Sequence, residues 1–157
     1  GYQQKDQDND ELDGMDEYIK INGQKFLDDQ FRSLVIEKIP EKCTFIGLCD
    51  TCHSGSMFDL DYDFNGRKWS RASYRPPVSR DCLSLGACLD NQLDNCDIGK
   101  TVGFGGSLTV HVIEQNLLPF LLNGQESDLL LVYQKLKDTF KSLNQVPVLQ
   151  KCFPRRK

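Results

Sequence analysis

The sequence predicts a single α/β domain, and three patterns support that prediction. Two nearly continuous apolar runs, residues 43–49 and 82–89, are typical of strands buried on both faces of a parallel sheet. Apolar residues recur at helical spacing over residues 127–143, which indicates an amphipathic helix packed on that sheet. At 157 residues the chain has the size of one domain and can bury a core without disulfide bonds.

The first part of the chain is expected to alternate strand and helix. Residues 1–17 are acidic and polar, which predicts a solvated surface loop. Residues 18–21 alternate as a short strand, and Asn22-Gly23 predicts a tight turn after it. Asp28 or Asp29 can cap the helix that follows, which ends before Pro40. The face of this helix expected to point inward consists of Phe31, Leu34, Val35 and Ile39.

A basic, proline-containing segment without periodicity, residues 61–81, predicts an exposed linker open to proteolysis. It divides the domain into two blocks, residues 1–60 and 82–157. In the second block, residues 107–115 are expected to be helical. Residues 146–149 predict a terminal edge strand, because Pro147 has no N–H to donate to a central ladder. The inward positions of the helix over 127–143 are Leu129, Val132, Tyr133, Leu136, Phe140 and Leu143.

Charge and cysteine content exclude several classes of function. The net charge of −4 argues against nucleic acid or an anionic membrane as the main partner. No apolar run approaches the ~20 residues needed to span a bilayer, and no signal-peptide pattern opens the chain. The seven cysteines are an odd number and several lie in strand-like runs. They predict free thiols in a reducing compartment, and therefore a cytoplasmic location.

The stretch GLCDTCHSGS, residues 47–56, carries a C-x-x-C-H pattern that admits several chemistries. Covalent haem is disfavoured because the first cysteine ends a buried strand instead of opening an exposed helix. A redox pair is disfavoured because HSGS makes a poor helix start. A four-cysteine zinc site needs two close pairs, and Cys49 and Cys52 are the one close pair. We therefore expect no haem and no zinc. Cys52 then fits a thiol nucleophile at the carboxyl end of a central strand.

Asp50 and the two histidines of the chain need an interpretation beside Cys52. An acid next to a thiol raises the pKa of that thiol, so Asp50 is better suited to bind a basic substrate side chain than to activate Cys52. The alternative for Asp50 is a turn-capping carboxylate. His53 is expected to pack in the turn, and His111 to have a structural role within its helix.

At these residues the sequence resembles a metacaspase, a caspase-like cysteine peptidase of the C14 type. The segments that carry the resemblance, in order, are DGMDEYI, FLDDQFRSLVIEKIPEKCTFIGLCDTCHSGSMFDL, LSLGACLDNQ with its C-x-D-x-Q motif, and GFGGSLTVHVIEQ. It implies a caspase-like three-layer fold with a mostly parallel central sheet flanked by helices. Residues 1–60 would then be the end of the large-subunit region and residues 82–157 the small-subunit region. The resemblance also implies a monomer.

The same resemblance implies roles for individual residues. Cys52 matches the nucleophile and Asp50 the floor of the pocket for an Arg or Lys side chain, with Asp90 near that pocket. The acids that match ligands of an activating Ca²⁺ are Asp16, Asp28, Asp29 and Asp59. Carboxylates converging from separate loops suit such a hard cation. A helix cap for Asp28 and a purely structural role for Asp59 stay open.

The catalytic histidine of the family is expected ~50 residues before the nucleophile, where this chain begins. Gly1 matches the glycine of the oxyanion hole, so the sequence predicts an N-terminally truncated chain. The expected function is a Ca²⁺-activated endopeptidase that cleaves peptides and proteins after Arg or Lys. Candidate self-processing residues are Arg67, Lys68, Arg71, Arg75 and Arg80. The alternative is an inactive caspase-like pseudoenzyme or interaction module, because that histidine is absent from these residues.

Overall fold

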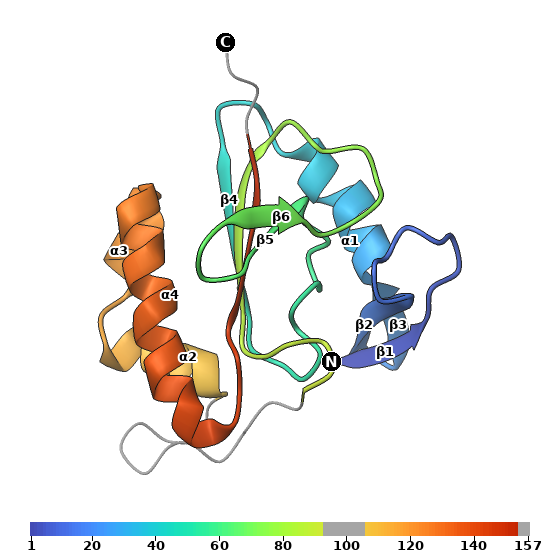
Figure 1. Ribbon diagram of the computed structural model, residues 1–157. Helices are drawn as coiled ribbons and strands as arrows, with labels where there is room; N and C mark the ends of the chain where they lie inside the picture. Colours follow the sequence, from blue (N-terminus) through green and yellow to red (C-terminus); the bar gives the residue numbers. More distant parts are fainter. Residues whose placement is uncertain (93–105, 154–157) are drawn as a thin grey trace.

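The computed structural model describes residues 1–92 and 106–153 and arranges them in three layers (Figure 1). A five-stranded sheet forms the middle layer. Helices α2 (Ser107–Glu114), α3 (Leu118–Asn123) and α4 (Glu126–Phe140) cover one face of it. Helix α1 (Asp28–Leu34) lies on the other side, together with a small three-stranded sheet. This mixed α/β arrangement is consistent with a caspase-like fold.

The five-stranded sheet has the order β4-β7-β8-β5-β6. Its strands are β4 (Thr44–Cys49), β5 (Tyr62–Phe64), β6 (Trp69–Arg71), β7 (Asp81–Gly86) and β8 (Val148–Cys152). The two apolar runs form β4 and β7, which pair in parallel. The predicted burial is confirmed for β7 but is wrong for β4, because β4 lies at an edge of the described sheet and Leu48 is 38% exposed. The other pairings between described strands are antiparallel, so the expectation of a mostly parallel sheet is wrong for this part of the chain. The reason is that a hairpin, β5 and β6, and a returning strand, β8, complete the sheet.

Two expectations about the ends of this sheet are corrected. The terminal strand β8 lies between β7 and β5 and not at an edge. Pro147 precedes the strand, so its missing N–H removes no bond from the ladder. The expected linker, residues 61–81, contributes β5 and β6 to the sheet, and its Ser73 is only 3% exposed. This segment is therefore part of the folded domain.

The smaller sheet consists of β1 (Tyr2–Lys5), β2 (Met15–Ile21) and β3 (Gln24–Leu27), all antiparallel. Asn22 and Gly23 both have positive φ, 50° and 79°, which confirms the predicted tight turn between β2 and β3. The solvated loop expected for residues 1–17 is wrong in part. β1 and the start of β2 occupy this stretch, and Asp6, Asp10, Asp16 and Glu17 are buried.

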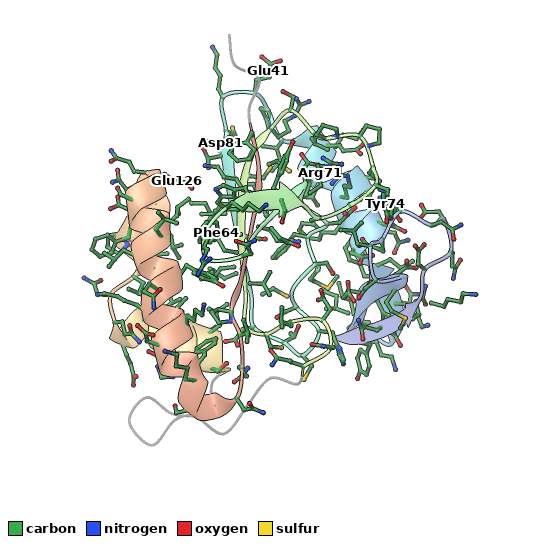
Figure 2. The ribbon with its side chains drawn as sticks, viewed as in Figure 1. Glu41, Phe64, Arg71, Tyr74, Asp81 and Glu126 are labelled. Atoms are coloured by element: carbon green, nitrogen blue, oxygen red, sulfur yellow. The ribbon has the colours of Figure 1, made fainter. Side chains whose placement is uncertain are left out.

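Two apolar clusters hold the layers together. The larger one lies between the sheet and α2 to α4, and Phe64 on β5 reaches into it to contact Tyr133 of α4 (Figure 2). The predicted inward residues of α4, Leu129, Val132, Tyr133, Leu136 and Phe140, are buried. Leu143 lies in the following 3₁₀ turn, η2 (Lys141–Leu143), and packs partly buried on this cluster.

The smaller cluster packs α1 against the opposite face of the sheet. The inward position predicted for Leu34 is wrong, because this side chain is 63% exposed. Helix α1 ends at Leu34, and the 3₁₀ turn η1 (Ile36–Lys38) changes the phase so that Ile36 is buried instead. No described helix has the length and apolar character to cross a bilayer. Cys96 and Gly103 to Gly105 lie outside the described residues.

Candidate active site and acidic cluster

Cys52 lies in the loop after β4, at the edge of the sheet where the parallel strands β4 and β7 both end. The loop is fastened to the segment after β7. The N–H of Ala87 donates to the Cys49 carbonyl at 3.0 Å, and the N–H of Cys88 donates to the Ser54 hydroxyl at 3.2 Å. The Cys52 side chain is half-buried and is not part of a disulfide. In open α/β sheets, ligands bind at this edge, so a ligand can reach a thiol placed here.

Gly1 packs against the backbone of the same loop. A Cβ atom at this position would collide with the Cys52 carbonyl oxygen and lie 2.9 Å from Thr51 Oγ1. A side chain at residue 1 therefore requires the loop to move. The fold thus brings the first residue of the chain next to the candidate nucleophile, as the resemblance implies.

Asp50 binds the N-terminus of helix α2. Its carboxylate accepts the N–H of Leu108 at 3.2 Å and the N–H of Thr109 at 2.7 Å. A Cβ atom at Gly106 would collide with the same carboxylate. Because the first N–H groups of a helix have no partner within the helix, this contact caps α2. Asp50 therefore caps a helix distant in the sequence, and not its own turn as the alternative expected.

His53 is held by the backbone that follows β7. Its N–H donates to the Gln92 carbonyl at 3.3 Å, and its Nδ1 contacts the Asp90 carbonyl oxygen. Since a carbonyl oxygen accepts only, Nδ1 is the donor in this contact. His111 lies on α2, where Nδ1 is 3.8 Å from Glu114 Oε2 and the ring packs on Phe140. These contacts agree with the structural roles expected for both histidines.

A second group of acids surrounds Ser56, at the end of the Cys52 loop. Asp90 accepts the N–H of Ser56 at 3.0 Å, and burial raises the pKa of Asp90. Glu17 of β2 is 1% exposed; it accepts the Ser56 hydroxyl and, at 2.8 Å, the side-chain amide of Gln3. Burial, with the charge of Asp90 nearby, raises the pKa of Glu17 to about 8. Carboxylate oxygens of Asp13, Glu17 and Asp90 lie within 4.8 Å of one another.

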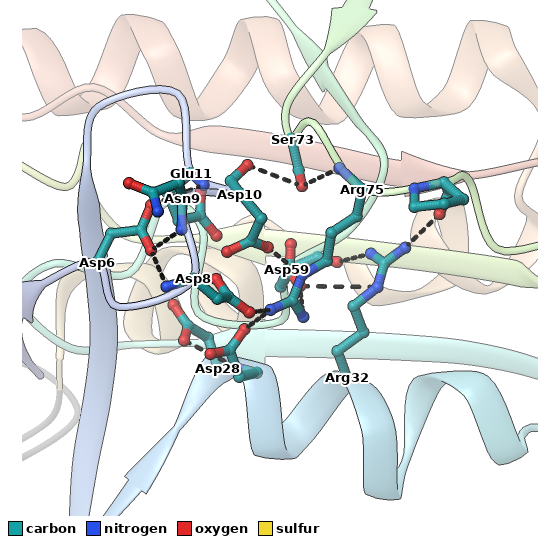
Figure 3. A network of polar contacts seen from close by, with 12 residues as sticks. Asp6, Asp8, Asn9, Asp10, Glu11, Asp28, Arg32, Asp59, Ser73 and Arg75 are labelled. Carbon is teal, nitrogen blue, oxygen red and sulfur yellow. Dashed lines mark hydrogen bonds and ion pairs between the residues drawn. The ribbon is translucent and has the colours of Figure 1, made fainter.

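The loop between β1 and β2 is organised by Asp6. Its carboxylate accepts three N–H groups, those of Asp8 at 2.9 Å, Asn9 at 2.7 Å and Glu11 at 3.2 Å. Asn9 adopts a left-handed conformation with φ 63°, a geometry that asparagine tolerates. The side chain of Asp6 thereby turns Asp8 and Asp10 toward the start of α1 (Figure 3).

Three carboxylates from separate elements converge at this point. Asp10 of the loop, Asp29 of α1 and Asp59 of the segment after β4 have ligating oxygens within 4.8 Å of one another. Asp59 is 2% exposed and adopts φ 44°. Burial raises the pKa of Asp59 and of Asp10 to about 7 each, although cationic side chains nearby oppose the shift. The structure therefore joins two of the four predicted Ca²⁺ ligands, Asp29 and Asp59, with Asp10.

The other two predicted ligands do not belong to this triad of described carboxylates. Asp28 is 1% exposed, and its two oxygens accept the N–H of Glu17 at 2.7 Å and the N–H of Asp29 at 2.8 Å. Burial raises the pKa of Asp28 to about 9. These bonds tie the start of α1 to β2, although the N-cap residue of α1 is Leu27 and not Asp28. Asp16 accepts the side-chain amide of Gln4 at 3.2 Å.

Two arginines contact the converging acids. Arg32 of α1 is 1% exposed and binds Asp61 at 2.9 Å, with Asp59 at 3.7 Å. Arg75 comes from the expected linker, and its guanidinium lies among four carboxylates (Figure 3). Those partners are Asp59 at 3.2 Å, Asp8 at 2.8 Å, Asp10 and Asp29.

Several known proteins are similar in sequence to parts of this chain. Residues 1–61 match the family described as the metacaspase, peptidase C14 domain. Metacaspase-1 of Schizosaccharomyces pombe is 37% identical over 70 residues, covering 41% of this chain and 16% of the relative. These matches support a metacaspase assignment, which the family model carries for residues 1–61. Metacaspase-2 of Trypanosoma brucei brucei is 29% identical over 92 residues, covering 53% of this chain and 26% of the relative. Metacaspase-1 of Plasmodium falciparum is 25% identical over 142 residues, covering 87% of this chain and 22% of the relative. The chain thus spans between 16% and 26% of the length of these three metacaspases.

Sequence reasoning missed Asp10, Glu17 and the partners of Arg75. A signal for the first was present, since Asp6, Asp8 and Asp10 alternate as acids do in cation-binding loops. No comparable signal points to Glu17 or Arg75. Their partners lie 39 and up to 67 residues away in the sequence, so only folding brings them together.

Proposed function

We propose that these residues form part of a cysteine endopeptidase in which the Cys52 thiolate attacks a peptide carbonyl. The observation that carries the proposal is the half-buried thiol at the carboxyl edge of β4 and β7, beside the backbone of Gly1. Attack forms a thioester and expels the amine, which takes a proton from a general acid. Water then hydrolyses the thioester to a carboxylic acid and restores the thiol. The Gly1 backbone N–H is proposed to stabilise the oxyanion.

The proposed base is a histidine upstream of Gly1, as the resemblance implies. His53 is expected to keep a structural role, because its Nδ1 ties the Cys52 loop to the Asp90 carbonyl. His111 lies on α2 next to Glu114. The 157 residues alone are therefore expected to have little or no activity.

A preference for Arg or Lys before the scissile bond is supported by the charge around the Cys52 loop. Asp50 lies two residues before Cys52, and Asp90 packs on Gly55, where a Cβ atom would be 2.7 Å from its carboxylate. With Asp13 close to Asp90, this side of the loop favours a cationic side chain.

Calcium activation is supported by the chemistry of the acidic triad. Carboxylate oxygens within 4.8 Å of one another can share one cation, since Ca²⁺ binds oxygens at about 2.3–2.6 Å. Asp10, Asp29 and Asp59 would hold the ion, with Asp8 beside them. When bound, the ion would neutralise these carboxylates and connect the β1–β2 loop, α1 and the segment after β4.

Self-processing within residues 61–81 is proposed to occur at Arg67 or Lys68, because both are exposed in the β5–β6 turn. The other basic residues have partners. Arg71 lies over the Tyr62 ring at 5.4 Å, and Arg80 donates to the carbonyls of Ser79 and Glu37. Arg75 is held by the acids and precedes Pro76, whose ring and tertiary nitrogen hinder cleavage.

The test uses the full-length protein, calcium and a pair of fluorogenic peptides ending in Arg or Asp. We expect calcium-dependent cleavage after Arg, loss of that activity in Cys52→Ala, and retention in the matched control Cys49→Ala. Activity that survives Cys52→Ala would overturn the assignment. Full-length protein that neither cleaves nor reacts with a thiol-directed electrophile at Cys52 would support the alternative of a pseudoenzyme.

The calcium ligands are best tested with Asp29→Asn. Asp59 also contacts Arg32, so its removal would disturb the fold, whereas the recorded ion pair of Asp29 is with Arg75. We expect Asp29→Asn to raise the calcium concentration needed for activation about tenfold or more, with little effect at saturating calcium. An unchanged calcium response would remove Asp29 from the site.

A further inference from the structure

Arg75 occupies the position where the acidic carboxylates converge. Its Nη1 is 3.2 Å from Asp59 Oδ2 and its Nη2 is 2.8 Å from Asp8 Oδ2, while Asp10 and Asp29 contact the same guanidinium. The side chain is only 20% exposed. One cation from residues 61–81 is thus shared by four carboxylates from three other elements (Figure 3).

The residues around Arg75 dock on the same acidic loop. The N–H of Tyr74 donates to the Asp10 carbonyl at 2.9 Å, and the Ser73 hydroxyl donates to that carbonyl at 3.3 Å. On either side the chain is attached elsewhere. Ala72 N–H donates to the Asp61 carbonyl and Val78 N–H to the Asp61 carboxylate, at 2.9 and 2.8 Å. Residues 73–77 can therefore leave the acidic loop while the sheet stays intact, although Arg32 also holds the Pro76 carbonyl at 3.1 Å and this bond has to break or to move with them.

The partners of Arg75 are also the candidate cation ligands. Asp10, Asp29 and Asp59 each contact the guanidinium and together form the triad with oxygens within 4.8 Å. A metal ion bound by those oxygens and a guanidinium bound to the same three groups require the same space.

We propose that Arg75 is a tethered cation that competes with Ca²⁺ for this cluster, so that calcium binding releases residues 73–77 from the β1–β2 loop. The inference deepens the proposed function and rests on its calcium site. Ca²⁺ carries twice the charge and binds carboxylates directly, whereas the guanidinium is held by hydrogen bonds and ion pairs. Calcium binding and the conformation of residues 73–77 are then reciprocally linked.

The experiment measures Ca²⁺ affinity by isothermal titration calorimetry in metal-free buffer. It compares the wild-type chain, Arg75→Gln and the matched control Arg80→Gln, which removes the same charge from the same segment without touching a carboxylate. We expect Arg75→Gln to bind Ca²⁺ about tenfold or more tightly than wild type, because no internal cation has to be displaced. Arg80→Gln should stay within about twofold of wild type.

Hydrogen exchange gives a readout that does not depend on activity. In the wild type, saturating Ca²⁺ should accelerate exchange of the Tyr74 amide, which leaves the Asp10 carbonyl, while the amides of β7 stay protected. In Arg75→Gln, exchange at Tyr74 should be fast before calcium is added. Unchanged protection at Tyr74 in calcium-saturated wild type would overturn the proposal.

The Ca²⁺ affinities of the three proteins distinguish failure of the proposed competition from failure of the proposed calcium site. Equal affinity in wild type and Arg75→Gln, or weaker binding by Arg75→Gln, would overturn the competition and leave the site standing. No binding by any of the three proteins would overturn both. If Arg75→Gln folds only with calcium, the ion has replaced the missing cation, which supports the proposal. If it folds in neither condition, the hydrogen-exchange measurement on the wild type decides, and unchanged protection at Tyr74 in saturating calcium would overturn the proposal.

Discussion

Replacing Glu17 by Gln is expected to remove a pH-dependent loss of stability. The Glu17 carboxyl is 1% exposed, and burial raises its pKa from the ordinary value of 4.5 to about 8. The folded protein therefore holds a proton there that the unfolded chain releases. Such a group contributes its full stability below the unfolded pKa and loses it as the pH rises through the folded pKa. Between about pH 5 and about pH 8 these two values correspond to a loss of about 3.5 kcal/mol.

Gln at this position is neutral at every pH and can keep both hydrogen bonds. Its oxygen can accept from Gln3, and its amide can donate to the Ser56 hydroxyl that Glu17 now accepts. Glu17→Gln and wild type should thus be similar in stability near pH 5. Near pH 8 the variant should be more stable, and most of the difference of about 3.5 kcal/mol should be recovered.

The assay is urea unfolding in the presence of a calcium chelator, followed through the single tryptophan, Trp69, which packs on Phe64 at 5.1 Å. The exposed Glu41 provides the control Glu41→Gln, the same chemical change at the surface. A stability difference between wild type and Glu17→Gln that is equal at both pH values would refute the reasoning. It would mean that Glu17 is already ionised in the folded protein.

Two further predictions concern the Cys52 loop and the β5–β6 turn. Asp50→Ala should destabilise the chain by about 1 kcal/mol, lowering the melting temperature by about 2–4 °C, since α2 loses its cap. Asp50→Asn, which keeps one acceptor oxygen, should be milder in melting but should reduce cleavage after Arg in the full-length enzyme; equal effects of both variants on melting would count against the cap. In limited trypsin digestion, mass spectrometry should find the first cut within residues 61–81 after Arg67 or Lys68, because their side chains are exposed. A first cut in this segment after Arg71 or Arg80 would contradict that ranking.

Local patterns predicted the elements that depend on neighbouring residues. The apolar runs of β4 and β7 and the Asn22-Gly23 turn need only the periodicity and turn preference of a few residues. The direction and place of β8 could not be predicted in this way. An interior antiparallel strand and an edge strand can have the same composition, and only the partners β7 and β5 decide between them.

For the candidate site as well, sequence predicted some features and tertiary structure decided the others. Sequence alone determined that Cys52 follows a strand and that acids from several segments suit a hard cation. It could not determine which acids meet, because a carboxylate near a helix start caps it or binds an ion according to what folds against it. Tertiary structure placed Asp28 on backbone amides, joined Asp10 to Asp29 and Asp59, and inserted Arg75 between them. Those contacts join residues as many as 67 positions apart. The Coulomb energy of two charges depends on their distance in space and not on their separation in the sequence. Which of these charges pair is therefore decided by how the chain packs.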